Sequence, residues 1–146
     1  MATNRKIRVG IIGANPSRGF ASIAHIPALQ SLPDFEISAV CTTRQDSAEA
    51  AARHYGVPLA FCGAEKLAQH PDVDLVAVSV KVPDHYPPVM AAIEAGKHIY
   101  CEWPLGRNTD EAHPDARCGK PQGHPPHCRV AGAGIAGNQL HQGPHC

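Results

Sequence analysis

The sequence predicts an α/β protein built on a doubly wound parallel sheet. Two observations carry this prediction: short apolar segments alternate with helical segments along residues 1–112, and a glycine-containing turn follows the first apolar segment. Strands and helices that alternate at this spacing form a parallel sheet with helices on both faces. The full length of 146 residues corresponds to one domain.

Three strands and three helices are expected in the first half of this pattern. Each strand is a short apolar segment, and each helix follows a turn or a polar residue that can start it. Asp46 is the expected N-cap of the second helix, because its carboxylate can accept a hydrogen bond from a free amide of the first turn. The expected strands lie at residues 6–12, 35–42 and 59–62, and the expected helices at residues 20–32, 47–54 and 64–70.

The second half continues the alternation. Residues 73–80 form an almost unbroken apolar run, which is typical of a central parallel strand covered on both faces. A helix over residues 84–95 should end at Gly96, since glycine favours the position that follows a helix. Residues 97–102 are the fifth expected strand, and Asn108 begins the capped start of one more helix. This order of elements is Rossmann-like.

Charge and hydropathy exclude two classes of partner. Thirteen basic residues balance thirteen acidic ones, so the chain lacks the basic excess that nucleic-acid binding usually needs. The longest apolar runs are far shorter than the ~18 residues that cross a bilayer. The charged residues 1–6 lead directly into a strand rather than into the apolar region of a secretion signal. We therefore expect a cytoplasmic protein that binds neither nucleic acid nor membrane.

The turn after the first strand has the features of a dinucleotide-binding turn. Gly13 supplies the tight turn, Asn15 stands where a second glycine usually lies, and Gly19 follows after one extra residue, giving G-x-N-x-x-x-G. Small residues at these places let the backbone approach a pyrophosphate. The alternative is an ordinary connection between strand and helix, with glycine chosen for a positive φ.

The end of the second strand bears on the choice between NAD and NADP. NAD enzymes place a carboxylate there to bind the ribose 2′-hydroxyl, but no carboxylate occurs before Asp46. Thr42, Thr43 and Arg44 offer hydroxyls and a guanidinium that can hold a 2′-phosphate. The sequence therefore favours NADP over NAD, with Thr43 and Arg44 at the adenosine ribose. The alternative places Arg44 in solvent at a helix entrance.

Residues 91–105, AAIEAGKHIYCEWPL, resemble the helix, fifth strand and E-K-P signature of the Gfo/Idh/MocA oxidoreductases. The resemblance extends from Arg8 to about Ala112 and implies a small-molecule substrate of the sugar or polyol kind. It also implies that the lysine of the signature reaches the nicotinamide and the substrate. Trp103 occupies that position here, and an indole has no proton to exchange near pH 7.

The same resemblance implies which residues border the nicotinamide. They come from the loop after the fourth strand and from the signature after the fifth. No catalytic residue is assigned, and the nearest candidates are Glu102, Trp103 and His85. For His85, the alternative is a polar residue in the first turn of a helix. The implied cofactor-binding residues of this part are Val80, Pro83, His85, Glu102, Trp103 and Pro104.

Three departures from the usual family pattern match a subset of the family. Asn15 in the first turn, the sequence Pro-Asp-His-Tyr at 83–86 and the Glu-Trp pair at 102–103 are similar to the subset that includes fungal galactose-pathway repressors. Those repressors use the fold to bind dinucleotide and a protein partner. Two functions therefore stay open: an NAD(P)-dependent oxidoreductase domain and a non-catalytic, dinucleotide-sensing regulatory module.

Residues 113–146 differ sharply in composition from the rest. Proline and glycine make up about 32% of them, against about 14% of residues 1–112, and no Phe, Trp or Tyr occurs among them. Such a segment cannot build a core and is expected to be an irregular, disordered C-terminal tail. The dinucleotide-binding domain is therefore expected over residues 1–112, with an incomplete sheet.

Two other interpretations of the tail stay open. One is a zinc site, but the paired cysteine spacing of zinc sites does not occur, so we expect no metal. The other is a shifted reading frame, because discarding one nucleotide permits the translation AGLQGRASPAINYIKDLI from codons 128–146. That string resembles the sixth strand and following helix of the family subset. The zinc-ligand candidates are His113, Cys118, His124, His127, Cys128, His141, His145 and Cys146.

A shifted frame implies that the family sequence is truncated near residue 112. The chain would then lack its final strand and its substrate domain, and we expect no turnover by this chain alone. A homo-oligomer is expected only if the missing domain is restored.

Overall fold

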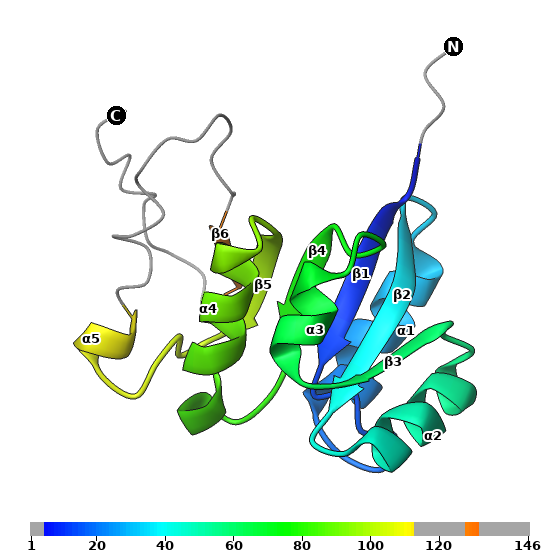
Figure 1. Cartoon of the computed structure of the whole chain (residues 1–146), viewed down its shortest axis with the longest axis horizontal. Coiled ribbons are helices and arrows are strands. Elements are labelled where there is room, and N and C mark those ends of the chain that lie inside the picture. The colour runs from blue at the N-terminus through cyan, green and yellow to red at the C-terminus, as the bar shows by residue number, and fades with distance from the viewer. Residues whose placement is uncertain (1–4, 113–127, 132–146) are drawn as a thin grey trace.

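Residues 5–112 and 128–131 are described by the computed structural model (Figure 1). The strands are β1 (Ile7–Ile12), β2 (Phe35–Thr42), β3 (Leu59–Cys62), β4 (Leu75–Val78), β5 (His98–Glu102) and β6 (Cys128–Ala131). The helices are α1 (Ile26–Ser31), α2 (Gln45–Tyr55), α3 (Ala64–Gln69), α4 (Tyr86–Glu94) and α5 (Thr109–Ala112). A π-helical turn, Ala21–His25, precedes α1, and a 3-10 turn, Val82–Asp84, precedes α4.

All strands pair in parallel in the order β3-β2-β1-β4-β5-β6, which confirms the predicted doubly wound sheet. The chain moves outward from β1 through β2 to β3, then crosses to β4 on the other side of β1 and continues to β5. The direction of winding therefore reverses between β1 and β4. In open sheets of this kind, the crevice for a ligand lies at the carboxyl ends of the strands at this point.

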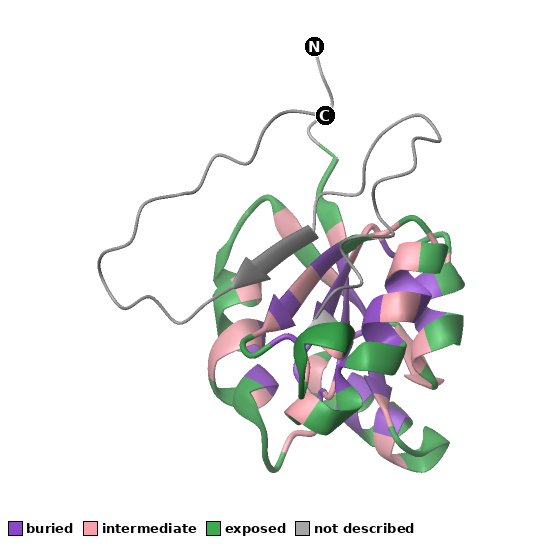
Figure 2. Ribbon diagram, turned by 90° about the vertical axis from the view of Figure 1, so that its left-hand side faces the viewer, coloured by how far each residue is buried: buried purple, intermediate pink, exposed green. Residues whose placement is uncertain are grey.

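Two apolar cores lie on opposite faces of the sheet (Figure 2). Because side chains alternate along a strand, Val9 and Ile11 of β1 belong to one core and Ile12 to the other. The first core contains residues of α1 and α2, and the second contains Leu67 of α3 and Val89 of α4. Helices thus cover both faces, as the near-continuous apolar strands predict.

Three expected helices begin differently in the structure. The helix expected from residue 84 begins at Tyr86, because Asp84 belongs to the preceding 3-10 turn. The region expected as one helix over residues 20–32 divides into the π-helical turn and α1, and Pro27 lies in the first turn of α1. Proline has no N–H to donate to the preceding turn, so one continuous α-helix is unfavourable there. Arg44, and not Asp46, occupies the N-cap position of α2. Asp46 lies in the first turn, where a carboxylate is still favoured by the helix dipole.

The strand β6 corrects part of the expectation for residues 113–146. Cys128–Ala131 pairs in parallel with β5, Ile99 opposite Cys128 and Glu102 opposite Ala131. Strand pairing uses backbone groups, and without β6 the outer edge of β5 would leave a row of them unpaired. The rest of the expected tail, with most of the zinc-ligand candidates and the proposed frame shift, lies outside the described residues.

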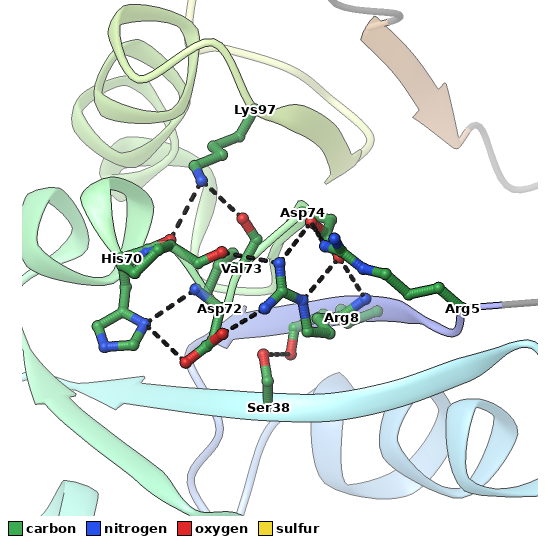
Figure 3. Close-up of polar contacts among 10 residues, drawn as sticks. Arg5, Arg8, Ser38, His70, Asp72, Val73, Asp74 and Lys97 are labelled. Atoms are coloured by element: carbon green, nitrogen blue, oxygen red, sulfur yellow. Dashed lines mark hydrogen bonds and ion pairs between the residues drawn. The ribbon is translucent and has the colours of Figure 1, made fainter. Parts of the chain in front are cut away.

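A cluster of charged residues fixes the amino-terminal ends of β1 and β4 (Figure 3). The Arg8 guanidinium donates to both carboxylate oxygens of Asp74 over 3.0 Å and also pairs with Asp72. Arg5 donates to Asp74 over 2.7 Å, and Lys97 Nζ donates to the backbone oxygen of Val73 over 2.7 Å. Hydrogen bonds from Arg8 hold the pKa of Asp74 well below its usual range, with Arg5 contributing less. The loop before β4 is thereby tied to β1.

Within the described ranges 5–112 and 128–131, no helix has the length and apolar character needed to cross a membrane.

Candidate functional site

The turn after β1 packs directly against the end of β4. Gly13 has a φ of +94°, and its N–H donates to the backbone oxygen of Cys41 over 2.9 Å. A Cβ atom at this position would lie 2.1 Å from the backbone oxygen of Ser79, a distance that no side chain allows. Gly13 is therefore required twice, for its positive φ and for the close approach of two backbone segments.

The rest of the turn has its own internal hydrogen bonds. Asn15 donates its N–H to the Gly13 oxygen over 2.9 Å, and its side-chain oxygen accepts from the Ser17 N–H over 2.9 Å. An asparagine side chain that bonds two residues ahead mimics a backbone turn. Gly19 has a φ of +105°, and a Cβ there would meet nothing closer than 3.8 Å. Glycine is therefore favoured at position 19 by its positive φ and not by a lack of room for a side chain.

Polar side chains order the loop at the end of β2. The Thr42 hydroxyl donates to the backbone oxygen of Arg44 over 3.0 Å, and the Ser47 hydroxyl donates to the same oxygen over 2.8 Å. The Arg44 side chain is 74% exposed, and its Nε donates to Asp46 Oδ1 over 3.0 Å while a second nitrogen bonds Oδ2. Thr43 is exposed beside it. Arg44 is thus an exposed cation that already holds a carboxylate.

This ion pair stabilises the charged form of both of its members. The hydrogen bond to Asp46 raises the pKa of the Arg44 guanidinium, and the same bond lowers the pKa of the Asp46 carboxyl. Both groups therefore remain charged across the physiological range. An incoming anion must either displace the Asp46 carboxylate from the Arg44 guanidinium or share the guanidinium with it.

Three polar side chains meet where β4 and β5 end. Glu102 Oε1 accepts from the Ser79 hydroxyl over 2.7 Å and from His25 Nε2–H over 2.6 Å. The His25 ring lies edge-on to the ring of Tyr100, with centroids 5.3 Å apart. Sequence analysis identified Glu102 but neither Ser79 nor His25. Glu102 and His25 are 77 positions apart, and no local motif marks the histidine.

His85 occupies a different place from the one the sequence suggested. Its side chain is buried at 1% exposure, and its two ring nitrogens lie 2.9 Å from the Val80 oxygen and 3.0 Å from the Pro104 oxygen. This enclosed ring does not face a cofactor edge, because both nitrogens are engaged by backbone. His85 instead links the loop after β4, which also carries the exposed Pro83, to the loop after β5.

Trp103 follows Glu102 on the exposed side of the same loop. Its side chain is 69% exposed, and the peptide bond between Trp103 and Pro104 is cis. Position 103 therefore presents a large apolar surface at the carboxyl end of β5, without a titratable group.

The structure brings most of the expected residues to one end of the sheet. Gly13 contacts Ser79, Ser79 bonds Glu102, and the end of β2 is joined to Gly13 through Cys41. Thr43 and Arg44 lie just beyond that end of β2. Among the described residues, no group of three or more His, Cys, Asp or Glu side chains is arranged to hold a metal ion.

Comparison with known proteins places this arrangement among oxidoreductases. The sequence model of a family described as "Oxidoreductase family, NAD-binding Rossmann fold" matches residues 7–123. The chain is 46% identical over 112 residues to the dehydrogenase aclE of Aspergillus oryzae, across 72% of this chain and 30% of that protein. It is 30% identical over 119 residues to the galactose/lactose metabolism regulatory protein GAL80 of Kluyveromyces lactis, across 75% of this chain and 26% of that protein.

A solved structure agrees with these matches. KijD10, a 3-ketoreductase from Actinomadura kijaniata in complex with NADP, is 31% identical to this chain with a TM-score of 0.65. The likeness covers 73% of this chain and 33% of that structure. The chain spans less than a third of the length of either curated relative.

Proposed function

This chain belongs to the Gfo/Idh/MocA family of oxidoreductases and carries its NAD-binding Rossmann domain, and we propose that the carboxyl end of its sheet binds a nicotinamide dinucleotide. In this proposal the turn after β1 receives the pyrophosphate, the end of β2 meets the adenosine ribose, and the loop after β5 borders the nicotinamide. The residues assigned to these three parts are Gly13, Asn15 and Gly19; Thr43 and Arg44; and Glu102, Trp103 and Pro104.

The observation that carries the proposal is the fit of Gly13. A positive φ and a backbone approach that excludes any Cβ occur where the sheet reverses its winding. The first glycine of a dinucleotide-binding turn makes the tight connection from strand to helix, and a positive φ with close packing against the next strand end is what Gly13 provides. A bound nicotinamide supplies a hydride donor or acceptor, while the protein supplies binding and orientation.

Titration with NADH and NADPH tests this proposal directly. Trp103 is the only tryptophan of the chain, and its indole emission overlaps the absorption of a reduced nicotinamide. We expect a saturable loss of indole emission with either dinucleotide, and a calorimetric titration with the same midpoint. A signal that stays linear with concentration in both experiments would contradict dinucleotide binding.

For the longer protein represented by the relatives, we propose oxidation or reduction of a sugar-like or polyol substrate. The described residues form the dinucleotide domain, so we expect no turnover by these 146 residues alone. A regulatory module is the second candidate. Trp103 favours it because an indole cannot exchange the proton that accompanies hydride transfer. A regulator binds dinucleotide without changing its redox state, so incubation with NADPH and sugar-like carbonyl compounds separates the two functions in the longer protein.

Cofactor choice gives a prediction at the end of β2. We propose that NADP is preferred, with the 2′-phosphate replacing Asp46 at the Arg44 guanidinium. Arg44→Gln should weaken NADPH binding about tenfold, the effect of losing one charge-assisted hydrogen bond, and leave NADH binding nearly unchanged. Asp46→Asn should strengthen NADPH binding, because the competing carboxylate is removed. The measurement is the ratio of NADPH to NADH dissociation constants.

The neighbouring Gln45 supplies a control for these variants. It lies in the same first turn of α2 and bonds Glu49 rather than Arg44. Gln45→Ala should leave the ratio of dissociation constants unchanged. If Arg44→Gln also leaves it unchanged, Arg44 does not meet the 2′-phosphate and the proposed NADP preference is wrong.

A further inference from the structure

We propose that His25 exchanges the proton that accompanies hydride transfer. It would take over the role of the lysine in the family signature, whose position is occupied here by Trp103. This inference rests on the proposed dinucleotide function and names the side chain that performs one of its steps. The side chains that carry it are His25, Glu102 and Ser79, which meet at the ends of β4 and β5.

The geometry of this cluster suits proton exchange. Glu102 Oε1 holds His25 Nε2–H at 2.6 Å and is itself fixed by the Ser79 hydroxyl at 2.7 Å. The side chains of His25 and Glu102 are 13% and 25% exposed, so the pair is mostly shielded from solvent but still partly accessible to it. A carboxylate that binds one imidazole nitrogen orients the ring and stabilises its protonated form. The other nitrogen, Nδ1, forms no hydrogen bond within the part of the chain that the structure describes.

The groups around the His25 ring come from several elements. Tyr100 and Glu102 contact it from β5, and Phe20, the residue before the π-helical turn, lies edge-on to it. Ser79 bonds Glu102 rather than the ring. Burial raises the pKa of the Tyr100 hydroxyl, which therefore stays protonated near neutral pH. Imidazole is the side chain whose charge ordinarily changes between pH 5 and 8.

The reaction balances with NAD(P)⁺ as the oxidant and a secondary alcohol as the substrate. The carbinol C–H bond would break, and its electron pair would leave as hydride to a bound nicotinamide. The O–H bond breaks, its electrons form the carbon–oxygen double bond, and its proton passes to His25 Nδ1. Glu102 stabilises the imidazolium, which then loses the proton to solvent. Reduction of a carbonyl compound runs through the same groups in reverse.

Proton release on binding tests the inference without turnover. The full chain is titrated by calorimetry with NADP⁺ and with NADPH at pH 6.5, in two buffers of different ionisation enthalpy, which gives the number of protons exchanged. The positive charge of the oxidised ring disfavours a second cation beside it, so NADP⁺ should release more protons on binding than NADPH.

Two variants assign that difference to one residue. His25→Gln retains an N–H that can donate to Glu102 but does not titrate, and should abolish the difference while both dinucleotides still bind. His54→Gln changes an exposed histidine of α2 that contacts Tyr55, and should keep the difference. The melting temperature of each variant reports whether the fold is intact.

The outcomes separate this inference from the proposed function. If the wild-type chain binds both dinucleotides with equal proton release, His25 is not the proton-exchanging group, while dinucleotide binding stands. The inference also fails if His25→Gln keeps the difference, or if it loses all binding, which would make the contact with Glu102 purely structural. If neither dinucleotide binds to the wild-type chain, the proposed function fails and this inference fails with it.

Discussion

Replacement of Gly13 by alanine is expected to abolish dinucleotide binding and to lower the free energy of unfolding by about 3 kcal/mol or more. The new Cβ would lie 2.1 Å from the Ser79 backbone oxygen and 2.9 Å from Cγ1 of Val80. Backbone cannot rotate aside as a side chain can, so the turn or the end of β4 must move. Either movement displaces the surface proposed to receive the pyrophosphate.

Gly19→Ala is the matched control for this prediction. Its φ of +105° is also unfavourable for alanine, but the new Cβ would have no neighbour closer than 3.8 Å. We expect a cost of about 1 kcal/mol from conformation alone. Urea unfolding followed by circular dichroism measures both stabilities, and titration with NADPH measures binding. Equal stability losses in the two variants would show that the contact with Ser79 does not constrain the turn.

The second large effect is expected at the charged cluster between β1 and β4. Asp74→Asn should lower the free energy of unfolding at pH 7 by about 2 kcal/mol, because hydrogen bonds to charged groups are among the stronger ones in proteins. The lost carboxylate accepts from Arg5, from the Arg8 side chain and from the Arg8 backbone N–H. Asp72→Asn is the control, and since Asp72 is more exposed we expect less than about 0.5 kcal/mol.

The pH dependence of this variant follows from the lowered pKa of Asp74. A carboxyl whose pKa is lower in the folded state stabilises the fold above the unfolded-state value, near 3.9, and loses that contribution as the pH falls below it. The difference between wild type and Asp74→Asn should therefore shrink by about 1 kcal/mol between pH 5 and pH 3. Urea unfolding at both pH values measures it, and a constant difference would contradict the assigned cause.

The sheet could be predicted from sequence because each of its first five strands is marked locally. Residues 59–62 were expected as a strand and form β3 with the same bounds, and residues 35–42 form β2 likewise. The expected run 73–80 is longer than β4, which covers Leu75–Val78. Apolar character continues beyond the paired segment because Val73 and Val80 still pack against the core.

The site was predictable only where its chemistry is local. Gly13 and Glu102 follow strands and belong to short motifs, so their place at the carboxyl end of the sheet could be predicted. His25 is joined to Glu102 by tertiary folding across 77 positions, and a single histidine in a helical segment predicts no partner. The burial of His85 was missed for a related reason, because the Pro104 oxygen that it bonds belongs to a different loop.

The strand order also has a consequence for synthesis on the ribosome. Val9 of β1 pairs with Ile37 on one side and with Leu75 on the other, so β1 gains its second neighbour only long after it has left the exit tunnel. Until then a nascent chain holds half a sheet with the edge of β1 open, a surface to which chaperones and other nascent strands can bind. The bond between Arg8 and Asp74, which spans 66 positions, closes that edge only after β4 has emerged.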